Sequence, residues 1–165
     1  MTVIAIGEWH DFFVAMAGAG AALAGLIVVT MSVTIKEILA ATTLPSRAAA
    51  TIAALVLVVI VSGMILIPGQ VHGWLGVELL VVSLVALLPQ IVLADRLLTQ
   101  KPARPVLENG YKILIGWLQG LPFVIGAVLI LFGQVNGFGW ITAGILLAIV
   151  YSMLNAWVLL VEIQR

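Results

Sequence analysis

Five long apolar runs dominate this chain, and charged or turn-forming residues separate each run from the next. Each run holds 20 to 24 residues, and a helix of about 20 residues spans the roughly 30 Å hydrocarbon core of a bilayer. Strands of a membrane barrel would be about half as long and would alternate apolar with polar residues. The runs do not alternate, so the sequence predicts an all-α integral membrane bundle of five transmembrane helices. The predicted spans are residues 12–35, 48–67, 74–94, 113–132 and 140–161.

The composition agrees with a membrane location. Hydrophobic residues make up 64% of the chain and charged residues only 8%, whereas a soluble domain carries roughly 25% charged residues. The longest connecting segment, residues 95–112, is too short for a soluble domain, so residues 1–165 are expected to form a single transmembrane domain. The net charge is zero, which gives no reason to expect a nucleic-acid partner, and the absence of cysteine excludes thiolate metal sites.

The basic residues predict the orientation of the five spans. All seven Lys and Arg residues fall at one end of the predicted bundle, and the positive-inside rule makes that end cytoplasmic. The N-terminus is then outside and the C-terminus cytoplasmic. The first ten residues contain no Lys or Arg, so we interpret the first run as a permanent helix rather than a signal peptide. The seven basic residues are Lys36, Arg47, Arg96, Lys101, Arg104, Lys112 and Arg165.

The first span is rich in glycine and alanine. Small residues four apart allow helix backbones to approach closely, and close packing drives helix association in lipid. The pairs are Gly18 with Ala22, Gly20 with Ala24 and Ala21 with Gly25. We therefore expect this helix to be buried, either inside the bundle or between protomers.

Polar groups inside the fourth and fifth spans allow two interpretations. Gln119 lies beside Pro122, which removes a backbone hydrogen bond from the fourth span. Ser152 and Asn155 share one face of the fifth span. These groups could line a solute path. They could instead form interhelical hydrogen bonds, because an unpaired amide in hydrocarbon costs about 4 kcal/mol or more.

Acidic and imidazole side chains gather at the predicted outer end. His10 and Asp11 precede the first span, His72 lies in the second outer loop, and Glu78 lies about one turn into the third span. A carboxylate inside a span is a functional candidate by default. We predict that these four residues converge on a metal, cation or proton site. The alternative is that each is an independently hydrated group, with the acids near the first helix favoured by its dipole.

The opening of the chain resembles a known family. Glu8-Trp9-His10-Asp11-Phe12-Phe13-Val14, followed by Ala21-Ala22-Leu23-Ala24-Gly25-Leu26, is similar to the start of a family of small multi-span bacterial membrane proteins of no established activity. The resemblance covers about the first 35 residues. It implies the bacterial plasma (inner) membrane as the location, and it brings no substrate or catalytic residue.

The expected function is non-enzymatic. No nucleophile paired with a base is visible in the sequence, and no cofactor is expected. We expect a small bundle that contacts the lipid bilayer and assembles as a homo-oligomer or within a larger membrane complex. The alternative is a channel or transporter for a small ion or solute, with polar groups around Glu78, Gln119, Pro122 and Asn155.

Overall fold

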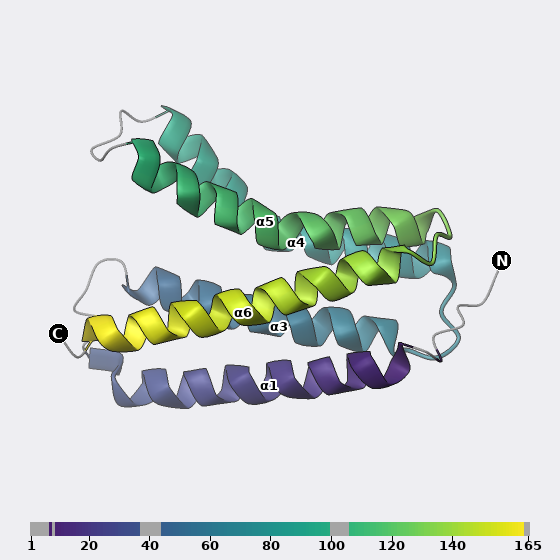
Figure 1. Cartoon of the computed structure of the whole chain (residues 1–165), viewed down its shortest axis with the longest axis horizontal. Coiled ribbons are helices and arrows are strands. Elements are labelled where there is room, and N and C mark those ends of the chain that lie inside the picture. The colour runs from purple at the N-terminus through teal and green to yellow at the C-terminus, as the bar shows by residue number, and fades with distance from the viewer. Residues whose placement is uncertain (1–6, 8, 37–43, 100–105, 164–165) are drawn as a thin grey trace. The chain divides into compact units, whose positions relative to one another are not determined.

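The computed structural model describes residues 7, 9–36, 44–99 and 106–163, and the regular structure in these ranges is entirely helical. The predicted all-α class is therefore confirmed. Figure 1 shows the five helices within these ranges. They are α1 (His10–Val33), α3 (Leu44–Ile65), α4 (His72–Thr99), α5 (Val106–Leu131) and α6 (Gly137–Ile163).

Three of the helices have the length and composition of membrane spans. The qualifying segments are His10–Val33, Ala48–Ile65 and Gly137–Val158, in α1, α3 and α6. The described side chains of α4 and α5 form shorter apolar segments, His72–Leu88 and Leu118–Leu131. Three helices long and apolar enough to cross a bilayer mark this chain as a membrane protein.

The helices α4 and α5 extend furthest beyond their predicted spans. The third predicted span, 74–94, corresponds to α4, which begins at His72 and continues to Thr99. The fourth, 113–132, corresponds to α5, which begins at Val106. The third predicted span ends before Asp95, and the fourth begins after Lys112. Charged side chains such as Arg, Lys and Glu have good helix propensity, so the backbone continues through them.

Glycine ends α5. Gly133 has a φ of 74°, its N–H donates to the carbonyl of Ile130, and the N–H of Gln134 donates to the carbonyl of Leu129, both at 2.9 Å. This pair of bonds is the Schellman motif, which satisfies carbonyls at a helix end and favours glycine in the left-handed position. A turn of only a few residues then leads into α6.

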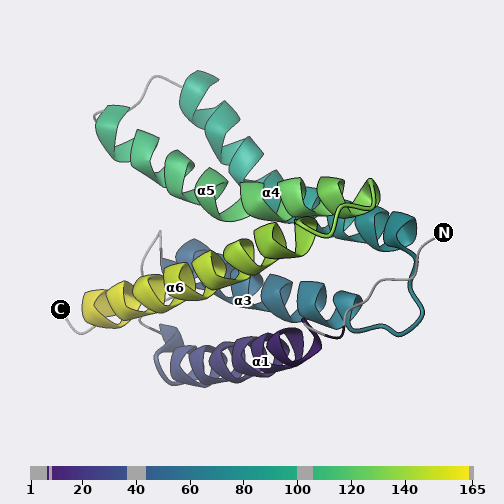
Figure 2. The ribbon, with the colours of Figure 1, turned by 45° about the vertical axis from the view of Figure 1, so that its right-hand side comes forward.

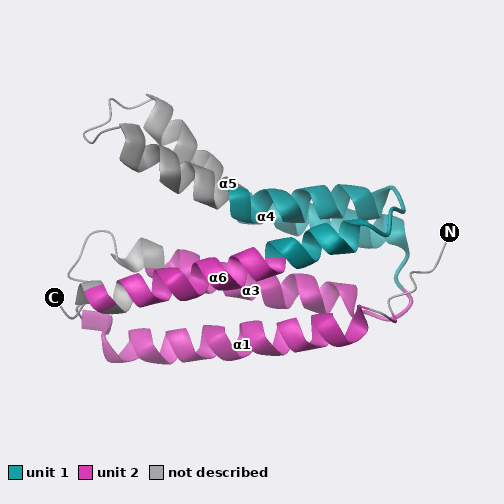
Figure 3. Cartoon of the chain, in the orientation of Figure 1, with its two compact units in different colours: residues 1–4, 70–144 teal, residues 5–69, 145–165 magenta. Residues whose placement is uncertain are grey.

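The chain divides into two compact units (Figure 3). Unit 1 comprises residues 1–4 and 70–144, and unit 2 comprises residues 5–69 and 145–165. The first turns of α6 therefore belong to unit 1, and the rest of α6 belongs to unit 2. That the two units form a single transmembrane domain remains a prediction.

In unit 1, α4 and α5 lie side by side, as Figures 1 and 2 both show. Gly76 of α4 faces the backbone of Leu131, and Gly120 of α5 faces the side chain of Leu87. From the first contact to the second, the chain runs toward the C-terminus of α4 (Gly76 to Leu87) and toward the N-terminus of α5 (Leu131 to Gly120). The two helices are therefore antiparallel. Gly144, in α6, packs against the ring of Phe123 in α5.

In unit 2, α1 packs against α3. A Cβ built on Gly20 would lie 3.1 Å from Val59 Cγ2, 3.2 Å from Val58 Cγ1 and 3.4 Å from the carbonyl oxygen of Leu55. Phe13 of α1 is also fully buried. The glycine thus gives α3 its close approach to α1.

Candidate functional site

The predicted small-residue interface of α1 divides into two faces in the structure. Gly20 faces α3, whereas a Cβ on Gly18 or Gly25 would meet no atom within 4 Å. Of the two predicted modes of burial, packing inside the bundle fits Gly20, whereas Gly18 and Gly25 meet no neighbour within unit 2 and leave burial between protomers as a prediction. We name the exposed stripe that contains them the open α1 face. Its residues are Val14, Gly18, Ala21, Gly25, Val28 and Ser32, all exposed.

The spacing of the open α1 face is that of a helix–helix contact. Its residues recur at alternating steps of four and three, the repeat that keeps one stripe of a helix against a partner helix. Three of the six are glycine or alanine, which allow backbones to approach. Only 11% of the α1 segment is buried, against 44% for α3. Among the described residues, α1 has the smallest buried fraction of the three candidate spans.

Aromatic rings gather at the start of α1. The ring centroids of Phe12 and Phe13 are 5.4 Å apart, and those of Trp9 and Phe12 are 6.4 Å apart, both in edge-to-face geometry. Such pairs add about 0.5–1.5 kcal/mol beyond the burial of their area. Tryptophan also favours the level of the lipid headgroups. The cluster therefore suits the external surface of the plasma membrane, where the sequence predicts the start of α1 to lie.

Two of the four predicted outer-site residues are in contact with each other. His10 Nδ1 lies 3.2 Å from Asp11 Oδ1, and both side chains are exposed. They occupy the first turn of α1, where the helix dipole favours a negative charge. Because the two residues are adjacent in the sequence and exposed, this contact forms locally and requires no other part of the fold.

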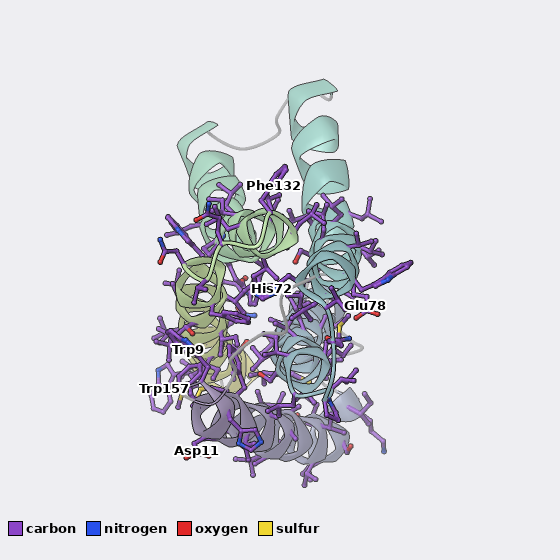
Figure 4. All side chains as sticks on the ribbon, turned by 90° about the vertical axis from the view of Figure 1, so that its right-hand side faces the viewer. Trp9, Asp11, His72, Glu78, Phe132 and Trp157 are labelled. Atoms are coloured by element: carbon purple, nitrogen blue, oxygen red, sulfur yellow. The ribbon has the colours of Figure 1, made fainter. Side chains whose placement is uncertain are left out.

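The other two residues belong to unit 1. Glu78 is half-buried in the second turn of α4, and its Oε2 accepts a 2.8 Å hydrogen bond from Nε2 of Gln70. Figure 4 labels Glu78 and His72 beside the first turns of α4, and Asp11 at the start of α1. Sequence reasoning missed Gln70. The sequence pattern that could have predicted this contact is an amide, Gln70, just before a helix that carries a carboxylate, Glu78, in its second turn.

The convergence of all four residues stays a prediction. His10 and Asp11 are in unit 2, and His72 and Glu78 are in unit 1. Within either unit, the described residues form no group of three His, Asp or Glu side chains able to hold a metal ion.

The polar residues of α6 contact α3 in unit 2. Nδ2 of Asn155 donates to Oγ1 of Thr51, and Oγ of Ser152 lies 3.5 Å from the carbonyl oxygen of Thr51. Thr51 and Ser152 are fully buried. This geometry favours the packing interpretation of Ser152 and Asn155 over the lining one. Thr51 was not predicted, because threonine in an apolar helix ordinarily bonds its own preceding turn.

Gln119 and Pro122 lie in α5 of unit 1. Pro122 is buried inside the helix, and Gln119 is half-buried. The adjacent Gly120 accommodates the side chain of Leu87. The proline is thus set in a closely packed stretch of helix, next to the contact between α5 and α4.

The sequence and the structure were compared with known proteins. Comparisons with protein-family models, with curated proteins and with solved structures find no match. The likeness of residues 8–26 to small bacterial membrane proteins therefore stays a prediction.

Proposed function

We propose that this chain is a five-span protein of the bacterial plasma membrane, with its N-terminus outside and its C-terminus cytoplasmic, that self-associates through the open α1 face. In this proposal it acts without catalysis, as a homo-oligomer or as an accessory subunit of a larger membrane complex. The observation that carries the proposal is the exposure of Gly18, Ala21 and Gly25 along one stripe of α1.

Lipid contact alone explains that stripe poorly. A helix face that meets only acyl chains gains nothing from glycine, and glycine lowers helix stability by about 0.5–1 kcal/mol relative to alanine. Close approach of a second helix gives the small residues a function, because it adds van der Waals contact along the whole stripe. A second copy of α1 presents the same face, so a two-fold contact between copies is self-complementary.

The channel or transporter alternative receives less support. Asn155 and Ser152, two of its polar groups, contact Thr51 of α3. Glu78 lies near the start of α4 and accepts a hydrogen bond from Gln70. Solute flux through liposomes that contain the purified protein would favour the alternative. Copurification of a partner in fixed ratio would favour the accessory role.

Disulfide crosslinking tests self-association directly, because the natural chain contains no cysteine. Gly25→Cys places a thiol on the open α1 face, and Leu26→Cys places one on lipid-exposed α1 surface about 100° around the helix. Leu26 is 64% exposed, so it controls for random collision. In native membranes under mild oxidation, we expect covalent dimers from Gly25→Cys and few from Leu26→Cys. Equal dimer yields, or none from either variant, would overturn the proposal.

A further inference from the structure

Glu78 has no basic side chain near it along the chain. It is the one charged residue between Arg47 and Asp95, and residues 113–161 contain none. The loops at the predicted outer end of unit 1 therefore supply no lysine or arginine. A half-buried carboxylate is stabilised by a nearby positive charge or by donated hydrogen bonds. The described hydrogen bond to the Glu78 side chain comes from the neutral amide of Gln70, which supplies a donor and no positive charge.

The hydrogen-bonding groups around Glu78 have an excess of acceptors. Gln70 uses Nε2 to donate to Glu78 Oε2 at 2.8 Å, while its own Oε1 is buried and has no hydrogen-bond partner among the described residues. A carboxylate offers about four lone-pair sites, whereas an –NH₃⁺ group offers three donors and no acceptor. An ammonium group therefore complements the half-buried Glu78 carboxylate in both charge and hydrogen bonding.

An exposed indole lies one helical turn before the carboxylate along α4. Trp74 precedes Glu78 by four residues, so the two side chains share one face of α4, and Trp74 is 67% exposed. The face of an indole attracts a cation held within about 6 Å of the ring. Trp74 also lines an open cavity of about 210 Å³ with Val71, Gly73 and Val77. The walls of this cavity are mainly apolar and suit hydrocarbon rather than a fully hydrated ion.

We propose that Trp74 and Glu78 bind the ammonium headgroup of a phospholipid, with the adjoining cavity taking the apolar part of the same lipid. The inference rests on the membrane location in the proposed function. The Glu78 carboxylate attracts a cation, and the Trp74 indole favours an organic cation. The apolar cavity lined by Trp74 favours a lipid over a free amine. A metal ion fits unit 1 less well, because no group of three described acidic or imidazole side chains gathers there.

Native mass spectrometry of the full-length protein, delipidated in maltoside detergent, tests this proposal. The probes are phosphatidylethanolamine and phosphatidylglycerol with identical acyl chains. We expect the parent protein to retain phosphatidylethanolamine about tenfold more strongly, as charge-assisted hydrogen bonds and a cation–π contact allow. Glu78→Gln and Trp74→Leu should each remove most of this preference. Trp140→Leu, which replaces an exposed tryptophan of α6, should leave it unchanged.

Further outcomes of these experiments distinguish a phospholipid from a free amine and from a metal ion. Equal retention of both lipids by the parent protein, or an unchanged preference in Glu78→Gln, would overturn the inference. Free ethanolamine that displaces phosphatidylethanolamine at equal concentration would show that the cavity adds nothing, and would overturn the lipid assignment. So would a calcium- or zinc-induced rise in melting temperature that Glu78→Gln abolishes and Trp74→Leu does not. If the parent protein retains both lipids equally while Gly25→Cys still forms covalent dimers, the lipid inference is refuted and self-association is not.

Discussion

Gly76 lies so close to Leu131 that a Cβ on the glycine would come within 2.5 Å of the Leu131 backbone nitrogen and Cα. The obstacle is backbone, so a flexible side chain cannot move aside to make room. The same antiparallel register brings Gly120 against Leu87. These two glycines set the distance between α4 and α5.

Gly76→Ala should therefore destabilise the protein. Overpacking a closed contact costs about 1–3 kcal/mol, which outweighs the 0.5–1 kcal/mol that alanine contributes to a helix. Thermal melting in detergent measures the change. Gly73→Ala is the control in the same helix, since a Cβ there meets no atom within 4 Å. A Gly76→Ala protein that melts at or above the parent temperature would contradict this close contact.

Two glycines of α1 should give different defects. Gly20→Leu places a large side chain against Val58 and Val59 and should lower the melting temperature, because it forces α1 away from α3. Gly25→Leu meets nothing in unit 2, so it should melt like the parent protein but fail to form oligomers. Light scattering and thermal melting on the same samples separate the two effects. If both variants assemble as the parent does, the open α1 face contacts lipid alone.

The polar contact between α3 and α6 should be worth a small, measurable amount. Interhelical hydrogen bonds in membranes average about 0.6 kcal/mol, with a maximum near 1.7 kcal/mol. A double-mutant cycle of Thr51→Val and Asn155→Ala should therefore give a coupling energy in this range. Ser62 of α3 supplies the control, because its buried Oγ has no partner within the described chain. Ser62→Ala should be neutral or stabilising, since it removes an unsatisfied hydroxyl. A coupling energy of zero would contradict the Asn155–Thr51 bond.

The predicted approach of the outer residues can be measured without a metal. His10→Cys combined with His72→Cys puts two thiols into a chain that otherwise has none. If the four residues converge, a short bifunctional thiol reagent should join the two positions within one chain, and a shift in gel mobility reports the closed loop. Val33→Cys with His72→Cys is the control, because Val33 ends α1. Equal crosslinking of both pairs, or no crosslinking of the first, would end the four-residue hypothesis.

The sequence predicted the helical class of the described residues because apolar length is a strong signal. The α4 and α5 helices extend beyond the predicted apolar spans, because a charge does not stop a helix. The sequence could not assign the faces of α1, since Gly20 and Gly25 both lie in a helix that is apolar on every side. The partners of Glu78 and Asn155, Gln70 and Thr51, come from contacts that no local spacing specifies. The structure, in turn, identifies three candidate spans by length and composition, in α1, α3 and α6.

Reporter fusions measure the five-span topology most directly. A reporter active only in the cytoplasm, joined after residue 40, 71, 100 or 136 in separate fusions, reports the side of each predicted loop. The positive-inside rule predicts activity at residues 40 and 100 and none at residues 71 and 136. The fusion after residue 100 is decisive because it follows α4 and precedes α5. A cytoplasmic signal there, with external readings at 71 and 136, would establish that both helices cross, and an external reading at residue 100 would contradict the five-span bundle.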